Sequence, residues 1–85
     1  KLKLFIKKNR PMPVIQYKDL QRTSSVALYE VGVNFIRVQF KFSPRVYQYS
    51  YLKAGKSHVE YMKILAKRGW GLNRYIKTFA NTLYD

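Results

Sequence analysis

Residues 35–51, FIRVQFKFSPRVYQYSY, carry the pattern that decides the fold. Apolar and polar side chains alternate over residues 35–42, which predicts a half-buried strand. The apolar members of this strand are Ile36, Val38, Phe40 and Phe42. A turn follows at Ser43, Pro44 and Arg45, because proline presets a turn-compatible backbone angle. Residues 46–51 then resume the alternation, so the stretch predicts a β-hairpin.

The length of the turn decides which face Tyr47, Tyr49 and Tyr51 occupy, because a one-residue change of register moves every side chain to the other face. A two-residue loop places the tyrosines beside Phe40, in the core. A three-residue loop places Tyr47 and Tyr49 on an exposed basic face, where they would stack nucleic-acid bases. We favour the core, because the intervening valine, glutamine and serine would make a poor buried face.

Outward from the hairpin, residues 25–30 read as a strand, and Gly32 with Asn34 forms the turn into residue 35. The sequence therefore predicts an α+β fold with a three-stranded antiparallel meander, or a four-stranded one if the amino-terminal segment joins. Residues 1–23 form a basic amino-terminal segment in which residues 1–10 are either an edge strand or an arm that orders on a polyanion. Prolines 11 and 13 mark a boundary, and residues 14–22 fit either a short strand or a helical turn.

A helix is expected from His58 to Arg68. Ser57 and Glu60 fit a capping box at its start, and Gly69 is a natural terminator. Helical spacing predicts a core-facing side of His58, Tyr61, Met62 and Leu65, and an opposite side of Glu60, Lys63 and Lys67. After Trp70 and Gly71, residues 72–79 predict a second, shorter helix with Asn73, Arg74 and Lys77 on its exposed side.

The order of these pieces resembles the KTSC domain family, short domains named for their occurrence at the carboxyl end of some lysyl-tRNA synthetases. The features that carry the resemblance are Ser24-Ser25, Tyr29-Glu30, the alternating strand of Ile36, Tyr47-Gln48-Tyr49, Ala66, Gly69, Leu72-Asn73 and Ile76-Lys77. They span a domain at residues 24–79 and leave a carboxyl-terminal tail at residues 80–85. The resemblance implies the fold and, through the association with a synthetase, RNA binding.

The charge balance points to an anionic partner. The 85 residues hold 17 lysines and arginines against four acidic residues, a net charge of +13. Nucleic acid is the commonest partner for such an excess, because each neutralised phosphate also releases a counterion. A membrane surface would need a basic amphipathic helix, and the sequence offers none. The remaining alternative is an acidic protein partner.

Catalysis and cofactor binding are poorly provided for. Cysteine is absent, and four scattered carboxylates with one histidine do not form a metal-ligand cluster. His58 is interpreted as structural, since it lies beside the expected helix cap. The enzyme alternative is a metal-free ribonuclease of the small toxin type, using Tyr47, Arg74, Lys77 and Tyr84. We expect a cytoplasmic protein without cofactor or small-molecule substrate.

The leading hypothesis is a nucleic-acid-binding module without catalytic activity, with RNA preferred over DNA. The expected contacts are Lys63, Lys67, Arg68, Trp70, Asn73, Arg74, Lys77, Tyr47 and Tyr49. Trp70 would either stack on a base or plug the seam between the two helices. Six to eight phosphate contacts would give a log–log salt slope of about −4 to −7.

Overall fold

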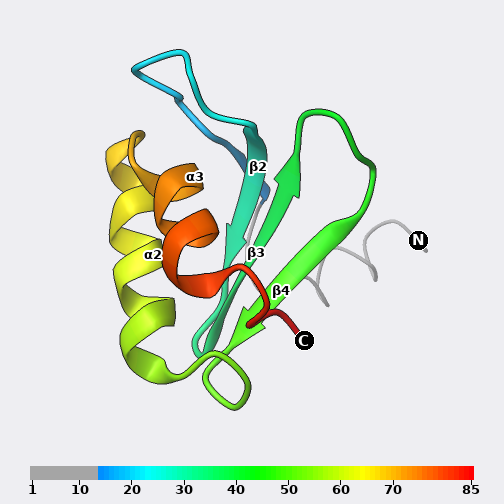
Figure 1. The fold of residues 1–85 in the computed structure, drawn as a ribbon, viewed down its shortest axis with the longest axis vertical. Helices are drawn as coiled ribbons and strands as arrows, with labels where there is room; N and C mark the ends of the chain where they lie inside the picture. Colours follow the sequence, from blue (N-terminus) through cyan, green and yellow to red (C-terminus); the bar gives the residue numbers. More distant parts are fainter. Residues whose placement is uncertain (1–13) are drawn as a thin grey trace, which may run out of the picture.

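A computed structural model describes residues 14–85, in which a four-stranded antiparallel sheet carries the helices on one face (Figure 1). The strands, each paired with the next, are β1 (Val14–Gln16), β2 (Val26–Val31), β3 (Phe35–Phe40) and β4 (Val46–Ser50). The helical elements that follow are α2 (Lys56–Arg68), α3 (Leu72–Tyr75) and the wide-turn π-helix η1 (Ile76–Ala80). The α+β prediction is confirmed, in its four-stranded form.

The fourth strand is β1, in the segment of residues 14–22 for which the sequence predicted either a short strand or a helical turn. β1 pairs with β2, so it belongs to the same sheet as the domain that was predicted to start at residue 24. The strand or arm expected for residues 1–10, and the proline boundary after it, lie outside the described residues.

The hairpin register places the tyrosines on the core face. Val38 pairs with Tyr47 and Ile36 pairs with Tyr49, so these four side chains point to the same side of the sheet. Tyr49 is 1% exposed, which confirms the core alternative. The loop is longer than either alternative, since residues 40–45 lie between the last paired residues. The strand ends at Phe40, and the expectation that it continues to Phe42 is wrong.

An irregularity in β2 adds to the core. The register between β2 and β3 shifts between Val26 and Leu28, which is the signature of a β-bulge. Because the extra residue changes the alternation, Val26 and Tyr29 are both buried although they are three residues apart. From the helical side, the core is completed by Val59, Met62, Leu65, Ala66, Leu72, Ile76 and Ala80.

Helix α2 begins two residues earlier than expected, and the predicted capping box is wrong. Gly55 is the N-cap, no side chain caps the helix, and Ser57 lies inside the first turn. The Glu60 carboxylate accepts hydrogen bonds from Tyr51 and Lys63 instead. The buried face is also rotated relative to the prediction, since it is centred on Val59 and Met62. The predicted end is confirmed, because Gly69 adopts a left-handed conformation with φ of 90°.

The carboxyl-terminal residues pack on the open edge of the sheet. The Asp85 amide donates to the Gln48 carbonyl at 2.7 Å, and its carboxylate accepts from the Gln48 and Ser50 side chains at 2.7 and 2.8 Å. Tyr84 makes an edge-to-face contact with Tyr47, with ring centroids 4.9 Å apart. Residues 80–85, expected as a tail, are therefore part of the folded body. Within residues 14–85 no helix has the length and apolar character needed to cross a membrane.

Candidate nucleic-acid interface

Five of the predicted contact residues gather where α2, α3 and η1 meet, whereas Lys67, exposed in the last turn of α2, lines no cleft with them. We call the set of five the basic surface: Arg68, Trp70, Asn73, Arg74 and Lys77. Two glycines bring it together. Gly69 ends α2 and Gly71, also at φ of 90°, precedes α3, so the chain reverses within a few residues. The last turn of α2 and the outer side of α3 consequently face solvent side by side.

Trp70 and Arg68 form a stacked pair on this surface. The Arg68 guanidinium carbon lies 3.4 Å from the centroid of the Trp70 ring, and its Nε donates to the Trp70 carbonyl at 3.3 Å. Trp70 is 41% exposed, whereas Leu72 is fully buried at the same junction. Trp70 therefore does not plug the seam between the helices. The stacked pair presents an aromatic and a cationic group to solvent together.

A cleft of about 450 Å³ adjoins the stacked pair and separates it from the loop between β1 and β2. Its lining residues are Gln21, Thr23, Ser24, Trp70, Gly71, Asn73, Arg74 and Lys77. We call it the loop cleft. It contains two cations, an indole, two amides and two hydroxyls, and no carboxylate. The residues contributed by the loop were not predicted as site residues, because only the tertiary fold brings them to α3.

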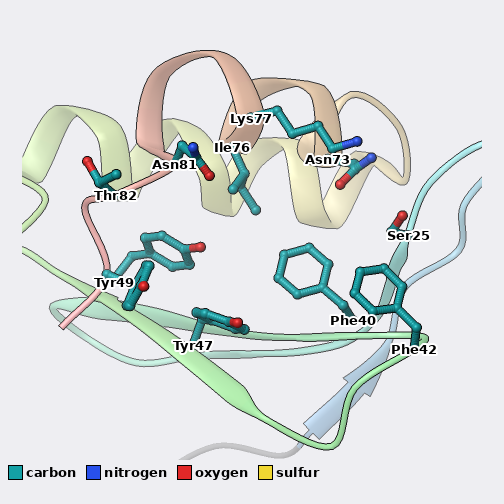
Figure 2. Close-up of a pocket in the computed structure, with 11 residues that line it drawn as sticks. Ser25, Phe40, Phe42, Tyr47, Tyr49, Asn73, Ile76, Lys77, Asn81 and Thr82 are labelled. Carbon is teal, nitrogen blue, oxygen red and sulfur yellow. The ribbon is translucent and has the colours of Figure 1, made fainter.

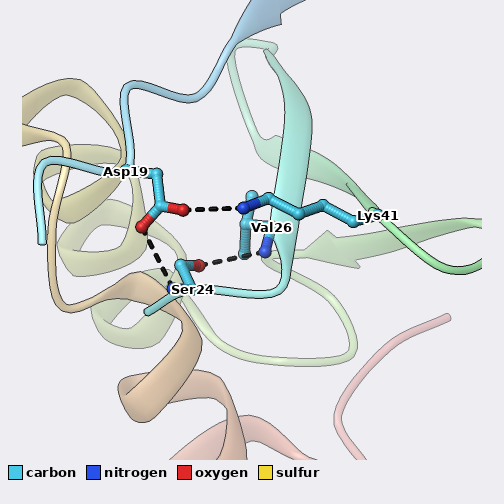
Figure 3. Close-up of polar contacts among 4 residues, drawn as sticks. All are labelled: Asp19, Ser24, Val26 and Lys41. Carbon is cyan, nitrogen blue, oxygen red and sulfur yellow. Dashed lines mark hydrogen bonds and ion pairs between the residues drawn. The ribbon is translucent and has the colours of Figure 1, made fainter. Parts of the chain in front are cut away.

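Asp19 holds this loop in place (Figure 3). Its carboxylate bonds Lys41 Nζ at 2.7 Å and accepts from the Ser24 amide at 3.0 Å. Ser24 Oγ in turn accepts from the Val26 amide at 2.9 Å, at the start of β2. The hydrogen bonds from Lys41 and then Ser24 lower the pKa of the Asp19 carboxyl. The backbone of Leu20 also donates to the Gly69 carbonyl at 2.8 Å, which ties the loop to the end of α2.

Lys63 was expected on the exposed side of α2, and this expectation is wrong. Its side chain is 10% exposed, and Nζ donates to the Val33 carbonyl at 3.1 Å and pairs with Glu60 at 2.8 Å. It also lies 5.7 Å from the centroid of the Tyr51 ring. Lys63 follows Val59 by one helical turn, so it shares the stripe that packs on the sheet. It contributes to the fold and is separate from the basic surface.

Tyr47 and Tyr49 lie in a second cleft, between η1 and the core face of β3 and β4 (Figure 2). We call this the aromatic cleft; its volume is about 430 Å³. The Tyr49 ring is buried, so it cannot stack a base on an exposed face as the three-residue loop would have allowed. Burial, with Tyr47 and Tyr84 nearby, raises the pKa of the Tyr49 hydroxyl to about 12. Tyr47 is half-buried and packs against Phe40 at 5.5 Å between ring centroids.

The chain was compared with protein-family models, curated proteins and solved structures. None of them matches. The resemblance to the KTSC domain family stays a prediction that rests on the quoted sequence features.

The four residues named for a ribonuclease do not all share one cleft. Tyr47, Lys77 and Tyr84 line the aromatic cleft, while Arg74 lines the loop cleft and a further cleft on the outer side of α3. His58 bonds the Tyr75 hydroxyl through Nδ1 at 2.6 Å. Within residues 14–85, no three side chains among His, Asp and Glu come together as a metal site.

All four carboxylates bond to residues outside the basic surface. Asp19 pairs with Lys41, Glu30 with Arg37 at 3.3 Å, and Glu60 with Lys63. Asp85, the fourth acid, bonds Gln48 and Ser50. Among residues 14–85, the cations outside these ion pairs are Lys18, Arg22, Arg45, Lys53, Lys56, Lys67, Arg68, Arg74 and Lys77. All three cations of the basic surface, Arg68, Arg74 and Lys77, belong to this unpaired group.

Proposed function

We propose that the protein is a cytoplasmic RNA-binding module without catalytic activity, and that the basic surface is its contact region. The observation that carries the proposal is the Arg68–Trp70 stack beside a carboxylate-free cleft lined by Arg74 and Lys77. Phosphates favour Lys and Arg, while an exposed indole offers a face on which an unpaired base stacks. Cations kept only for solubility would be mixed with acidic side chains.

RNA fits this surface better than duplex DNA. Besides its two cations, the loop cleft is lined by an aromatic ring, two amides and two hydroxyls, which suits unstacked bases and 2′-hydroxyls. Major-groove reading of duplex DNA uses an α-helix or a two-stranded β-ribbon, whereas the only regular α-helical turn that the basic surface presents beyond the end of α2 is α3, Leu72–Tyr75. Single-stranded or loop RNA is therefore the proposed ligand.

The basic surface fixes the expected salt dependence. Its three cations give a log–log slope of about −2 to −3 if each contacts one phosphate. This is shallower than the slope expected from the sequence, partly because Lys63 no longer counts as a phosphate contact. A steeper slope would mean that cations outside the basic surface also contact phosphate.

The proposal is tested by the fluorescence of Trp70, the only tryptophan, during titration with single-stranded RNA, duplex RNA and single-stranded DNA at several salt concentrations. Arg74→Ala, which removes a cation of the basic surface, is compared with Lys53→Ala, the loss of an exposed cation beyond the other end of α2. We expect quenching by RNA, and a salt slope for single-stranded RNA that is reduced by about 0.7 in Arg74→Ala alone. Absence of RNA binding at low salt, or equal effects of the two substitutions, would contradict the proposal.

A second candidate function is docking of an acidic protein, favoured by aromatic side chains on the outer side of the helices. Tyr75 packs between Tyr61 and Phe79 with centroids 5.0 Å from each, and Phe79 is 58% exposed. These rings line a cleft of about 350 Å³ together with Arg68 and Arg74. Such apolar surface beside cations suits an acidic, apolar segment. A partner retained in a pull-down after nuclease treatment would favour this function over RNA binding.

A further inference from the structure

The aromatic cleft is built differently from the basic surface. Its floor is formed by Phe40, Phe42 and Tyr47 on the sheet side, and Ile76 faces them from η1 (Figure 2). Phe42 is 78% exposed and stacks on Phe40 with ring planes 17° apart, so the aromatic floor extends to the mouth of the cleft. Its volume of about 430 Å³ lies in the range of roughly 300–1,000 Å³ that is typical of small-ligand sites. A planar ring is the shape that such walls accommodate best.

The polar groups of this cleft are free to bind a ligand. The uncharged ones belong to Ser25, Asn73, Asn81, Thr82, Tyr47, Tyr49 and Tyr84. None of these side chains is hydrogen-bonded to another residue within the described range 14–85. The Tyr49 hydroxyl stays protonated far above neutral pH, so it is a permanent donor. Asn73 and Asn81 both carry donor and acceptor groups, which is the combination that reads the edge of a base.

Cations flank the cleft on two sides. Lys77 lines it from η1, and the Arg45 guanidinium lies 4.7 Å from the Tyr47 ring centroid and 5.4 Å from that of Tyr84. Neither cation forms an ion pair within residues 14–85, and no carboxylate lines the cleft. A ligand that complements this cleft would carry negative charge on both sides of an aromatic, amide-bearing group.

The aromatic cleft also adjoins the basic surface. Asn73 and Lys77 line both this cleft and the loop cleft, so the two clefts share a wall. A single-stranded nucleic acid that crosses the basic surface can therefore enter the aromatic cleft while it stays in contact with the protein.

We propose that the aromatic cleft takes up one unstacked base of single-stranded RNA, with Asn73 and Asn81 bonding its edge and Lys77 and Arg45 contacting the flanking phosphates. This inference rests on the RNA-binding function proposed above and adds a base-specific subsite to it. Base pairing removes the polar edge that the amides would read, so a duplex is excluded from the subsite.

The test uses fluorescence anisotropy of labelled single-stranded RNAs, including four homopolymers, and of a blunt RNA duplex. Phe42→Ala removes an exposed wall, and Asn81→Ala removes an amide that the fold does not use. Their matched controls are Leu52→Ala and Asn34→Ala, at exposed positions that do not line the cleft. We expect about a tenfold loss of affinity for single strands in Phe42→Ala and about a fivefold loss in Asn81→Ala.

The pattern across ligands decides the outcome. We expect duplex affinity and the salt slope to stay unchanged in Phe42→Ala and Asn81→Ala, because neither change removes a charge. The preference among homopolymers should shrink in Asn81→Ala. If both variants bind single strands like the wild type while Arg74→Ala weakens this binding, the subsite is wrong and the RNA-binding surface stands. Equal losses for single strands and duplex also overturn the subsite, and absence of RNA binding by the wild type overturns both proposals.

Discussion

Replacing Lys63 should destabilise the fold and leave RNA affinity intact, although the sequence grouped this lysine with the phosphate contacts. Lys63→Ala removes three largely buried methylenes, worth about 2 kcal/mol in total. It also removes the bond to the Val33 carbonyl, worth about 1 kcal/mol. The Glu60 pair adds little, because that carboxylate is 43% exposed. The expected loss of about 3 kcal/mol corresponds to a fall in Tm of roughly 12–24 °C for a domain of this size.

A second substitution distinguishes the contribution of the aliphatic part of the Lys63 side chain from that of its ammonium group. Lys63→Met keeps the apolar length and loses only the polar contacts, so its Tm should fall by roughly 4–8 °C. Thermal unfolding followed by circular dichroism measures both variants, and RNA titration well below their Tm measures affinity. Both should bind RNA with the wild-type salt slope. If Lys63→Ala unfolds like the wild type and lowers the slope as Arg74→Ala does, then Lys63 is a surface cation and the reasoning fails.

Three further predictions concern the loop, the helix end and catalysis. Because its folded-state pKa is lowered, Asp19 contributes stability above its unfolded value of about 4, and this stability is lost as pH falls through the lower folded value. Asp19→Asn should therefore flatten the acid limb of stability against pH in denaturant titrations, and an unchanged limb would count against the loop anchor. Gly69→Ala should destabilise more than Gly55→Ala in the same assay: both have positive φ, but a Cβ at Gly69 would lie 3.0 Å from the Lys18 Cβ, whereas Gly55 has open space. RNA incubated with the protein and a chelator should stay intact, and cleavage that is lost in Tyr47→Phe would instead establish the ribonuclease alternative.

The strands and their faces were predictable because alternation and parity are local properties. Residues 35–40 specify a strand, and any loop of matching parity brings Tyr49 onto the face of Ile36. The loop length was not predictable, since Phe42 is as apolar as Phe40 but packs beyond the last paired residue. Nothing in the sequence near Phe42 distinguishes a strand end from a strand interior.

The burial of the Lys63 side chain depends on a long-range contact. Its acceptor is the Val33 carbonyl, in the turn between β2 and β3, thirty residues away in the chain. Val59 and Ala66 are buried on the same side of α2, but a lysine there ordinarily extends its ammonium to solvent, and only the docking of α2 supplies the acceptor that holds it. The basic surface was easier to predict, because Arg68, Trp70 and Arg74 lie within a few residues of two glycines that reverse the chain.

The aromatic cleft shows why a binding site can be unpredictable from a sequence whose strands are predictable. Its walls come from β3, β4, η1 and the carboxyl-terminal residues, which are distant in the chain. Asp85 bonds Gln48 and Ser50 on β4, and this contact sets Tyr84 against Tyr47 and Tyr49. The same side chains therefore complete the sheet edge and close one end of the cleft. Since Asn81 lies on the segment that they anchor, the position of its amide depends on a contact that no local pattern encodes.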